Sequence, residues 1–385
     1  MALRTLTHPD REPLGVYVHV PFCRVHCPYC DFYTYPSGRG QAPDFVDAVC
    51  REIEMVDLRL APDAYTVATV YFGGGTPSTL TGSQLSRLLD TLKKRLRLSP
   101  EAEITLEANP EDITSQALES WRGAGINRIS LGIQTFDPDR LEFLGRVHSA
   151  GRAREALEAV RSFPNWSADL MFGWEHQTLP ELNADLEEVL TYAPPHVSLY
   201  QLTLEPRTRM GVLAAQDRVR CALPEAQAEL YLSACDRLDQ AGILQYEVSN
   251  FARPGCESRH NRSYWERRAY VGLGPSAASL LCERRSRNLA SWPHYRDRLR
   301  ASRLPVGAIE VLTPEEVATE RLWLGLRTAQ GVPLDSLGSE HERLIRKAES
   351  DGLVSTAGQG RIVLTRKGMA VADELAARLL LNRES

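Results

Sequence analysis

The chain has 385 residues, of which 43% are hydrophobic and 25% are charged, and its formal net charge at pH 7 is −5. These are ordinary values for a globular protein, and the slightly acidic balance gives no broad attraction to nucleic acids or membrane surfaces. No apolar run is long enough to span a bilayer and residues 1–13 have no signal-peptide pattern, so we expect a cytoplasmic protein under reducing conditions that binds membranes at most transiently.

The first element that the sequence predicts is a strand followed by a cysteine-rich loop. Residues 14–20 are rich in β-branched and aromatic side chains, and Pro21 ends the run. Cys23, Cys27 and Cys30 follow with the spacing C-x3-C-x2-C. A cube of four irons normally takes one cysteine per iron, so three thiolates leave one iron for a ligand that is not protein. The motif therefore predicts an iron–sulfur cluster with an open iron.

Three other interpretations of these cysteines stay open at this point. A zinc ion could take His19 or His26 as its fourth ligand, although structural zinc usually draws its ligands from separated pairs. Disulfides are typical of exported chains, and three buried structural thiols are the third alternative. The remaining cysteines have no close spacing, so we expect no second cluster and most of them in the core: Cys50, Cys221, Cys235, Cys256 and Cys282.

A glycine-rich segment follows the second predicted strand. Residues 44–60 have the pattern of a helix, and residues 67–72 predict a strand that leads into a loop, Gly73-Gly74-Gly75-Thr76-Pro77. Glycines let a backbone approach a ligand closely, and exposed amides and carbonyls can bind a carboxylate or an ammonium group. A plain tight turn has the same composition, so this segment alone does not establish a site.

Strands and helices alternate over the next part of the chain. The apolar face of one helix consists of Leu85, Leu88, Leu89, Leu92 and Leu96. Further strands are predicted over residues 104–108, 128–133, 168–172 and 197–202, with helices between them over residues 114–123, 151–162 and 180–192. Six strands that alternate with helices predict a parallel sheet, and this periodicity suits both a barrel and a doubly wound sheet.

The pattern changes after a predicted helix over residues 223–240. Residues 253–287 are rich in arginine and interrupted by glycine and proline, which is typical of a connecting segment. Thr313-Pro314-Glu315-Glu316 combines an N-cap, a proline at the first helical position and a capping-box glutamate, so a second domain is predicted to begin there.

The last part of the chain has the element order of a winged helix. We predict a helix over residues 340–350, short strands over 353–355 and 361–364 around Gly358-Gln359-Gly360, and a helix over 366–381. Its basic residues are expected on a solvated face and not at a nucleic-acid site: Arg343, Arg346, Lys347, Arg366 and Lys367.

Eight stretches of the chain together carry a resemblance to a known family. They are YVHVPFCRVHCPYCDF (17–32), YFGGGTPS (71–78), LEANPE (106–111), ISLGIQTF (129–136), LGRVHS (144–149), SLYQLTLEPRT (198–208), YEVSNFA (246–252) and HNRSYW (260–265). With these motifs the chain resembles the radical S-adenosylmethionine (SAM) superfamily. Within it, the chain is similar to the oxygen-independent coproporphyrinogen oxidase group, and most of all to its haem-chaperone branch, HemW. The resemblance covers almost the whole chain, and residues 301–385 match more loosely.

The resemblance implies a fold and a domain organisation. The α/β core would be a partial, TIM-like (β/α)6 barrel, with the motifs at the carboxyl ends of the strands. We expect an N-terminal tail over residues 1–13, the radical SAM core over 14–252, a connecting segment over 253–300, and a C-terminal α+β, winged-helix-like domain over 301–385.

The resemblance also implies the residues that hold the cofactors. Cys23, Cys27 and Cys30 would ligate a four-iron, four-sulfur (4Fe–4S) cluster whose open iron chelates SAM. Given an electron donor, such a cluster cleaves SAM to methionine and a 5′-deoxyadenosyl radical. The SAM contacts would come from Tyr17, Tyr29, Gly74, Gly75, Thr76, Glu107, Gln134, Arg146 and Asp169.

One loop departs from the family pattern. After the aspartate that matches Asp169, the family usually continues Gly-Leu-Pro-Gly-Gln, whereas this chain has Gly173-Trp174-Glu175-His176-Gln177. The family's contacts in that loop are therefore not carried over to this chain.

Two differences separate the chain from the oxidases, which would use the radical to decarboxylate a propionate side chain. Asp31-Phe32 follows Cys30 where the oxidases carry an extra cysteine two residues on, and the stretch before Cys23 is shorter than their N-terminal extension. We therefore expect a haem chaperone that passes its haem cargo to haem-requiring acceptor proteins and lacks oxidase activity. A coproporphyrinogen III oxidase is the alternative.

The HNRSYW motif is the candidate for haem contact. His260 would ligate the haem iron, or would instead hold this segment through structural hydrogen bonds. Four neighbouring arginines would either pair with the haem propionates or be solvated: Arg259, Arg262, Arg267 and Arg268.

Overall fold

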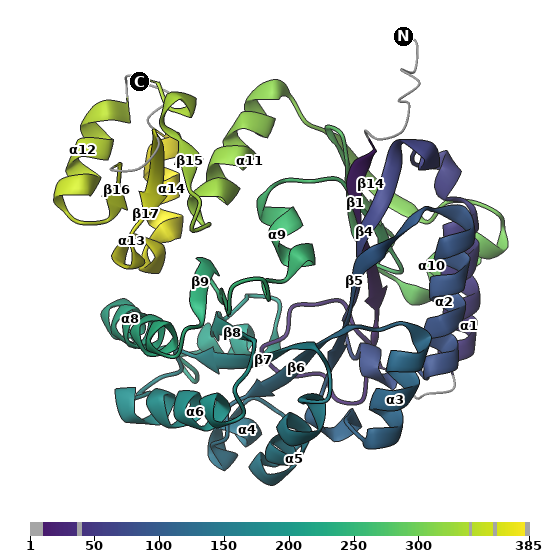
Figure 1. Cartoon of the computed structure of the whole chain (residues 1–385), viewed down its shortest axis with the longest axis horizontal. Coiled ribbons are helices and arrows are strands. Elements are labelled where there is room, and N and C mark those ends of the chain that lie inside the picture. Colours follow the sequence, from purple (N-terminus) through teal and green to yellow (C-terminus); the bar gives the residue numbers. More distant parts are fainter. Residues whose placement is uncertain (1–10, 37–40, 339–340, 357–359, 382–385) are drawn as a thin grey trace. The chain divides into compact units, whose positions relative to one another are not determined.

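The computed structural model describes residues 11–36, 41–338, 341–356 and 360–381 (Figure 1). Most of the predicted tail, the predicted helix start at Glu340, and Gly358 and Gln359 of the predicted turn lie outside these residues. The chain divides into two compact units. Unit 1 contains Met1–Gly132, Gly145–Trp166 and Arg268–Leu312, and unit 2 contains Ile133–Leu144, Ser167–Arg267 and Thr313–Ser385.

Unit 1 is built on a mixed sheet with the strand order β14-β13-β12-β11-β1-β4-β5-β6, in which the last two residues of β6 are assigned to unit 2. The pairs β1–β4, β4–β5 and β5–β6 are parallel, which confirms the prediction, and β11 lies parallel to β1 on the other side. The pairs from β11 to β14 are antiparallel. The bounds are β1 Glu12–Val20, β4 Tyr65–Gly74, β5 Leu98–Ala108, β6 Arg128–Gln134, β11 Tyr270–Leu273, β12 Ala278–Leu281, β13 Arg284–Asn288 and β14 Val306–Val311.

Helices α1 (Ala42–Glu54), α2 (Gly82–Arg95) and α3 (Ser115–Ala124) lie side by side along β1, β4 and β5 (Figure 1). The predicted leucine face of α2 is buried, and Thr81 begins this helix with a capping box to Gln84. Unit 1 also contains β2 Phe22–Cys23, β3 Tyr35–Pro36, α5 Ala150–Val160, α10 Trp292–Arg300 and the 3-10 turns η2 Val56–Leu58, η3 Pro62–Ala64, η4 Pro77–Thr79 and η5 Pro110–Asp112.

Several predicted boundaries in unit 1 were wrong; the strand predicted over residues 104–108, for example, begins at Leu98. The helix predicted to end at residue 60 ends at Glu54, and the turn η2 follows it. Val56 and Leu60 lie beyond the helix but are buried, so the apolar pattern of the sequence continues past the end of the helix. The strand predicted to end at Phe72 continues through Gly73 and Gly74, because the parallel register pairs these glycines with the last residues of β1.

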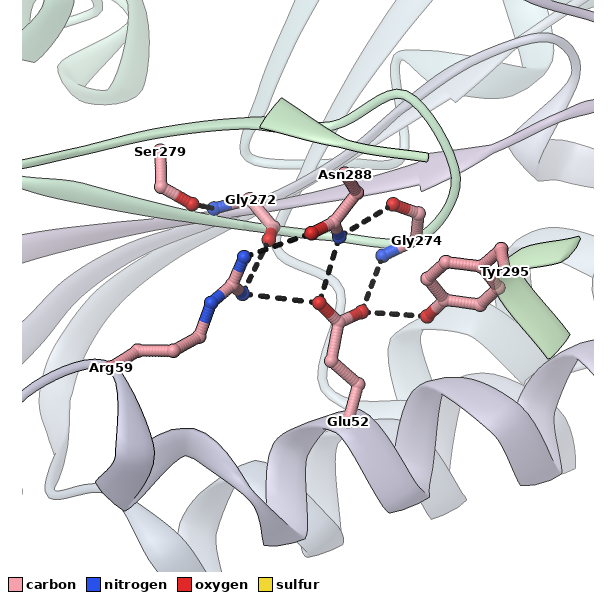
Figure 2. A network of polar contacts seen from close by, with 7 residues as sticks. All are labelled: Glu52, Arg59, Gly272, Gly274, Ser279, Asn288 and Tyr295. Carbon is pink, nitrogen blue, oxygen red and sulfur yellow. Dashed lines mark hydrogen bonds and ion pairs between the residues drawn. The ribbon is translucent and has the colours of Figure 1, made fainter. Parts of the chain in front are cut away.

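Residues of the segment predicted as a connection are tied to α1 by a buried polar network, shown in Figure 2. Glu52 of α1 accepts hydrogen bonds from Asn288 Nδ2 at 2.7 Å, from the Gly274 nitrogen at 2.9 Å and from the Tyr295 hydroxyl at 2.6 Å. Arg59 completes the network at 3.1 Å from Glu52 and 2.9 Å from Asn288 Oδ1. The strands β11, β12 and β13 are therefore an integral part of unit 1.

Unit 2 contains a second run of paired strands. β7 (Asn165–Phe172) and β8 (His196–Gln201) are parallel, while β10 (Asn250–Ala252) pairs antiparallel with both β8 and β9 (Leu244–Glu247). Helices α6 (Leu179–Thr191) and α8 (Pro224–Gln240) lie side by side (Figure 1). The shorter helices are α4 Pro138–Phe143, α7 Arg209–Ala214 and α9 Arg259–Trp265.

The C-terminal part of unit 2 is an α+β arrangement. The predicted capping box is confirmed, because Thr313 Oγ1 accepts from the Glu316 nitrogen and the Glu316 carboxylate accepts from the Thr313 nitrogen. The predicted last helix breaks at Val371, whose φ of −125° and ψ of 27° are not helical. The elements are α11 Pro314–Leu326, β15 Val332–Pro333, η6 Leu334–Ser336, α12 Glu342–Ser350, β16 Val354–Ser355, β17 Arg361–Leu364, α13 Arg366–Ala370 and α14 Ala372–Leu381.

Across the described parts of the chain, we find no helix whose length and apolar character would let it cross a membrane.

Candidate functional site

The three motif cysteines lie in the loop that follows β1. Cys23 is the last residue of β2, and the Cys30 nitrogen donates to the Cys27 carbonyl at 3.1 Å, so the loop turns tightly between the second and third cysteines. All three side chains are partly exposed and have free thiols. Burial raises the pKa of the Cys23 thiol, and it raises that of Cys30 to about 11.

An arginine from a distant part of unit 1 reaches this loop. Arg146 Nη1 lies 3.9 Å from the sulfur of Cys27. Its Nη2 donates to Asn109 Oδ1 at 2.6 Å and to the Gly132 carbonyl at 2.9 Å. Cys27, Thr76, Asn109 and Arg146 line one small pocket. A guanidinium fixed by two oxygen acceptors is thus presented beside a cysteine of the motif.

The glycine-rich segment is held by a carboxylate on the neighbouring strand. Glu107 of β5 accepts from the Tyr71 hydroxyl at 2.8 Å and from the Gly74 nitrogen at 3.1 Å. Gly74 has a φ of +110°, which favours glycine, and a Cβ there would meet the His19 ring at 2.5 Å. At Gly75 a Cβ would lie 2.8 Å from two backbone carbonyls of the cysteine loop's start. Both positions therefore require glycine.

Thr76 and Tyr17 complete the contacts around this segment. The Thr76 hydroxyl lies 3.5 Å from the Cys23 sulfur, which links the end of the glycine segment to the cysteine loop. The Tyr17 hydroxyl lies 3.1 Å from His19 Nδ1, and His19 Nε2 lies 2.8 Å from the Tyr33 carbonyl. Burial lowers the pKa of His19, so the ring is neutral and donates from Nε2 to the carbonyl.

The donor set is compatible with an iron–sulfur cluster. Within the described residues, no three His, Cys, Asp or Glu side chains converge on a point where one metal ion would bind. The thiolates of a 4Fe–4S cluster bind different irons, so their sulfurs need not converge on one point. The loop holds three free thiols, and Arg146 and the glycine-rich end of β4 lie beside it. These features suit a 4Fe–4S cluster.

Three other predicted site residues have different surroundings. Tyr29 lies between the second and third cysteines, and burial raises the pKa of its hydroxyl. Gln134 ends β6 with a φ of +70°, and Asp169 lies on β7 within 3.2 Å of the Ser167 hydroxyl. These last two residues belong to unit 2, whereas the cysteines, Glu107 and Arg146 belong to unit 1.

The loop that departs from the family pattern is an internally bonded turn. The Gln177 side chain accepts from the Gly173 nitrogen at 2.6 Å, and the Gln177 nitrogen donates to the Trp174 carbonyl at 3.1 Å. Trp174 is 1% exposed, while His176 has a φ of +63° and an exposed side chain. The tryptophan thus serves as a core residue that anchors the turn.

His260 is buried on α9. It is 1% exposed, and its Nε2 lies 2.9 Å from the Tyr264 hydroxyl one helical turn later. The Ser258 side chain caps the helix. Tyr246 of the YEVSNFA stretch holds the start of this segment, because its hydroxyl accepts from the Ser258 nitrogen at 3.3 Å and lies 2.8 Å from His196 Nε2.

Sequence reasoning missed three residues that position the site. Tyr71, Asn109 and His19 contact Glu107, Arg146 and Tyr17, respectively. All three lie inside the stretches that carry the family resemblance, which was the available signal. His19 lies two residues from Tyr17 on β1, whereas no local pattern connects Tyr71 and Asn109 to their partners.

Comparisons with known proteins give a consistent result. The profile of the radical SAM superfamily matches residues 17–189, and that of the HemN C-terminal domain matches residues 312–371. The chain is 38% identical over 380 residues to the heme chaperone HemW of Mycobacterium tuberculosis (strain ATCC 25618 / H37Rv), which covers 96% of this chain and 95% of that protein. It is 33% identical over 377 residues to the heme chaperone HemW of Bacillus subtilis (strain 168), covering 95% and 99%.

A solved structure shares the fold. Coproporphyrinogen III oxidase (HemN) from Escherichia coli, described as a radical SAM enzyme, superposes with a TM-score of 0.81 at 22% identity, over 96% of this chain and 90% of that chain. At this identity the likeness establishes the fold and leaves activity to other observations.

Proposed function

Because the chain belongs to the HemW family of radical SAM proteins, we propose that it is a haem chaperone, which binds haem and transfers it to haem-requiring acceptor proteins. The observation that carries this proposal is relatedness at 38% identity over 96% of the chain. The match extends from the radical SAM core to the C-terminal domain, so it is not limited to the part that all superfamily members share.

Membership of the superfamily implies a 4Fe–4S cluster and SAM. Cys23, Cys27 and Cys30 are the residues that would hold the cluster, since they are free thiols in one loop. When bound, such a cluster supplies one electron to the sulfonium of SAM, and this electron must come from a donor protein or small reductant.

The residues around the cluster loop have separable roles in this proposal. Glu107 fixes the Gly74 amide, so the end of β4 is rigid before a ligand arrives. Arg146 brings a positive charge to the side of Cys27, next to the place where the cluster would bind. Gly74, Gly75 and Thr76 would approach the methionine end of SAM, with Tyr17, Tyr29, Gln134 and Asp169 as further contacts.

The chaperone is favoured over an oxidase by the residues after Cys30. Phe32 is 64% exposed and occupies the position at which the oxidases carry an extra cysteine. The proposed domain boundaries are those expected from the sequence, with a core over residues 14–252 and a C-terminal domain over 301–385. A cytoplasmic location is proposed because partly exposed cluster thiolates require reducing surroundings.

Haem transfer after anaerobic reconstitution tests the function. The protein, reconstituted with iron and sulfide and loaded with haem, is mixed with a haem-free acceptor enzyme, and acceptor activity and the Soret band are followed. We expect transfer of haem, and no protoporphyrinogen from coproporphyrinogen III with SAM and a reductant. Formation of that product at enzymatic rates, without haem transfer, would establish the oxidase instead.

A further inference from the structure

Unit 2 contains a cavity of about 560 Å³ that shares no residue with the cluster loop. Its volume lies in the usual range of small-molecule sites. The walls come from β9, from α9 and the segment before it (252–257), and from α11 and the turn after it, with one residue of β17. Its lining includes two aromatic residues, Tyr246 and Trp265, and the arginines Arg262, Arg321 and Arg361.

Helix α9 divides the HNRSYW motif between two faces. Arg262, Trp265 and Glu266 line the cavity, and their spacing of three and four residues places them on one face. His260, whose Nε2 lies against the Tyr264 hydroxyl, is buried and is not part of the lining. The motif therefore contributes Arg262 and Trp265 to the lining of the cavity, while His260 contacts Tyr264 within the helix.

The turn after α11 forms another wall of the cavity, and main-chain hydrogen bonds join this turn to β9 and the residue after it. The Ala329 nitrogen donates to the Tyr246 carbonyl at 3.0 Å, and the Val248 nitrogen donates to the Arg327 carbonyl at 2.9 Å. Arg327 is itself held by Asp373 of α14, with its Nε at 3.0 Å. The C-terminal domain thus forms a fixed wall of the cavity.

Two of the lining arginines are suited to bind an anion. Arg262 is paired with Glu266 at 3.3 Å, and Arg267 with Glu320 at 2.8 Å. Arg361 donates to the carbonyls of Gln330 and Gly331, both at 2.7 Å, and within the described residues no carboxylate pairs with it. Arg321 is exposed and has no carboxylate partner among the residues that the structure describes. Tyr246 and Trp265 add two aromatic residues to the lining of the same cavity.

We propose that this cavity binds the haem cargo through its propionates and ring: Arg321 and Arg361 pair with the carboxylates, and Trp265 packs against the macrocycle. The inference rests on the proposed chaperone function and adds the site. An arginine pair matches two carboxylates, and an indole face matches a large planar ring, whereas His260 is already committed to Tyr264. In this proposal the cavity recognises the propionates and the ring of the porphyrin, and no side chain of the cavity is assigned to the iron.

Titration of the full-length protein with porphyrins tests the site. Haem, iron-free protoporphyrin IX and the dimethyl ester of protoporphyrin are titrated into wild type, Arg321→Glu and Trp265→Ala, with Soret absorbance or tryptophan quenching as the readout. The matched control is Arg346→Glu, an exposed charge reversal on α12 outside the cavity. Unchanged unfolding midpoints establish that each variant is folded.

We expect Arg321→Glu to weaken haem and protoporphyrin IX binding about tenfold, which corresponds to about 1.4 kcal/mol. Arg346→Glu should bind like wild type. Esterification should weaken binding to wild type more than to Arg321→Glu, because that variant has already lost the propionate partner. Iron-free porphyrin should show the same dependence on Arg321 as haem.

The outcomes separate the site from the function. Wild-type haem binding with equal affinities in Arg321→Glu, Trp265→Ala and Arg346→Glu overturns the cavity and leaves the chaperone function standing. Binding of haem but not of iron-free porphyrin overturns recognition through the propionates and ring. A wild type that binds no haem overturns the function, and the site falls with it.

Discussion

Oε2 of Glu107 lies 3.1 Å from the backbone nitrogen of Gly74, so a carboxylate on β5 holds the last residue of β4. The same carboxylate accepts from the Tyr71 hydroxyl, which leaves both of its oxygens engaged. The glycine-rich end of β4 is therefore shaped by a residue that is distant in sequence.

Glu107→Gln should weaken SAM binding about tenfold without loss of the cluster. A glutamine has one acceptor, so its amide nitrogen would oppose either the Tyr71 hydroxyl or the Gly74 N–H, and one buried hydrogen bond would be lost, which is worth about 1–3 kcal/mol. Equilibrium binding of SAM to reconstituted protein measures the effect. Glu101→Gln, an exposed change on the same strand, is the control, and equal affinities in both variants would contradict the prediction.

Changing Cys23, Cys27 or Cys30 to Ala should abolish the cluster. Each thiolate would bind a separate iron, so the loss of one leaves two irons without protein ligands. Cys235→Ala is the matched control, because this cysteine is buried in α8 and burial raises the pKa of its thiol to about 12. Iron and sulfide analysis after anaerobic reconstitution gives the answer, and a full four-iron content in Cys27→Ala would refute the assignment.

Glu52→Ala should lower the free energy of unfolding by about 3–5 kcal/mol, because it leaves Arg59 as an uncompensated buried charge. Asp47→Ala removes the partner of Arg87, and both of those side chains are about half exposed, so this control should change stability by less than about 1 kcal/mol. Denaturant unfolding of the cluster-free protein compares the two variants. Similar small losses in both would show that the network of Figure 2 does not stabilise unit 1.

The stability of the chain should depend on the titration of Glu247. Burial raises the pKa of this carboxyl from 4.5 to about 7, although the Ser249 nitrogen donates to it at 3.0 Å. The folded state therefore holds its proton more tightly than the unfolded chain. The stabilisation is fully present below pH 4.5 and is lost as the pH rises to about 7, in total about 3 kcal/mol.

Glu247→Gln removes this titration and leaves every other group in place. The difference in unfolding free energy between wild type and variant should shift by about 3 kcal/mol in favour of the variant between pH 4.5 and pH 8. Denaturant unfolding of both proteins at the two pH values measures it. A difference that is independent of pH would show that Glu247 titrates normally.

Local patterns predicted the order and type of the main elements. The leucines of α2, the parallel strands and the capping box at Thr313 all follow from spacings of a few residues, which depend only on helix and strand geometry. The candidate cluster ligands were also predictable, because Cys23, Cys27 and Cys30 lie in one short loop. The strands β11 to β13 were not predicted, because the arginines of this segment conceal the alternation that marks a strand.

By itself, then, the sequence determined the alternation of strands and helices, the cysteine motif and the family. Tertiary structure decided the partners: Arg146 beside Cys27, Glu107 on Gly74, and His260 turned to Tyr264 while Trp265 lines the cavity. The physical reason is that side-chain periodicity is local, whereas a contact between residues 107 and 74 depends on the register of parallel strands joined through a helix. The register of the strands and the face that a helix packs against its neighbours depend on which surfaces the whole unit buries. No short segment of the sequence contains that information.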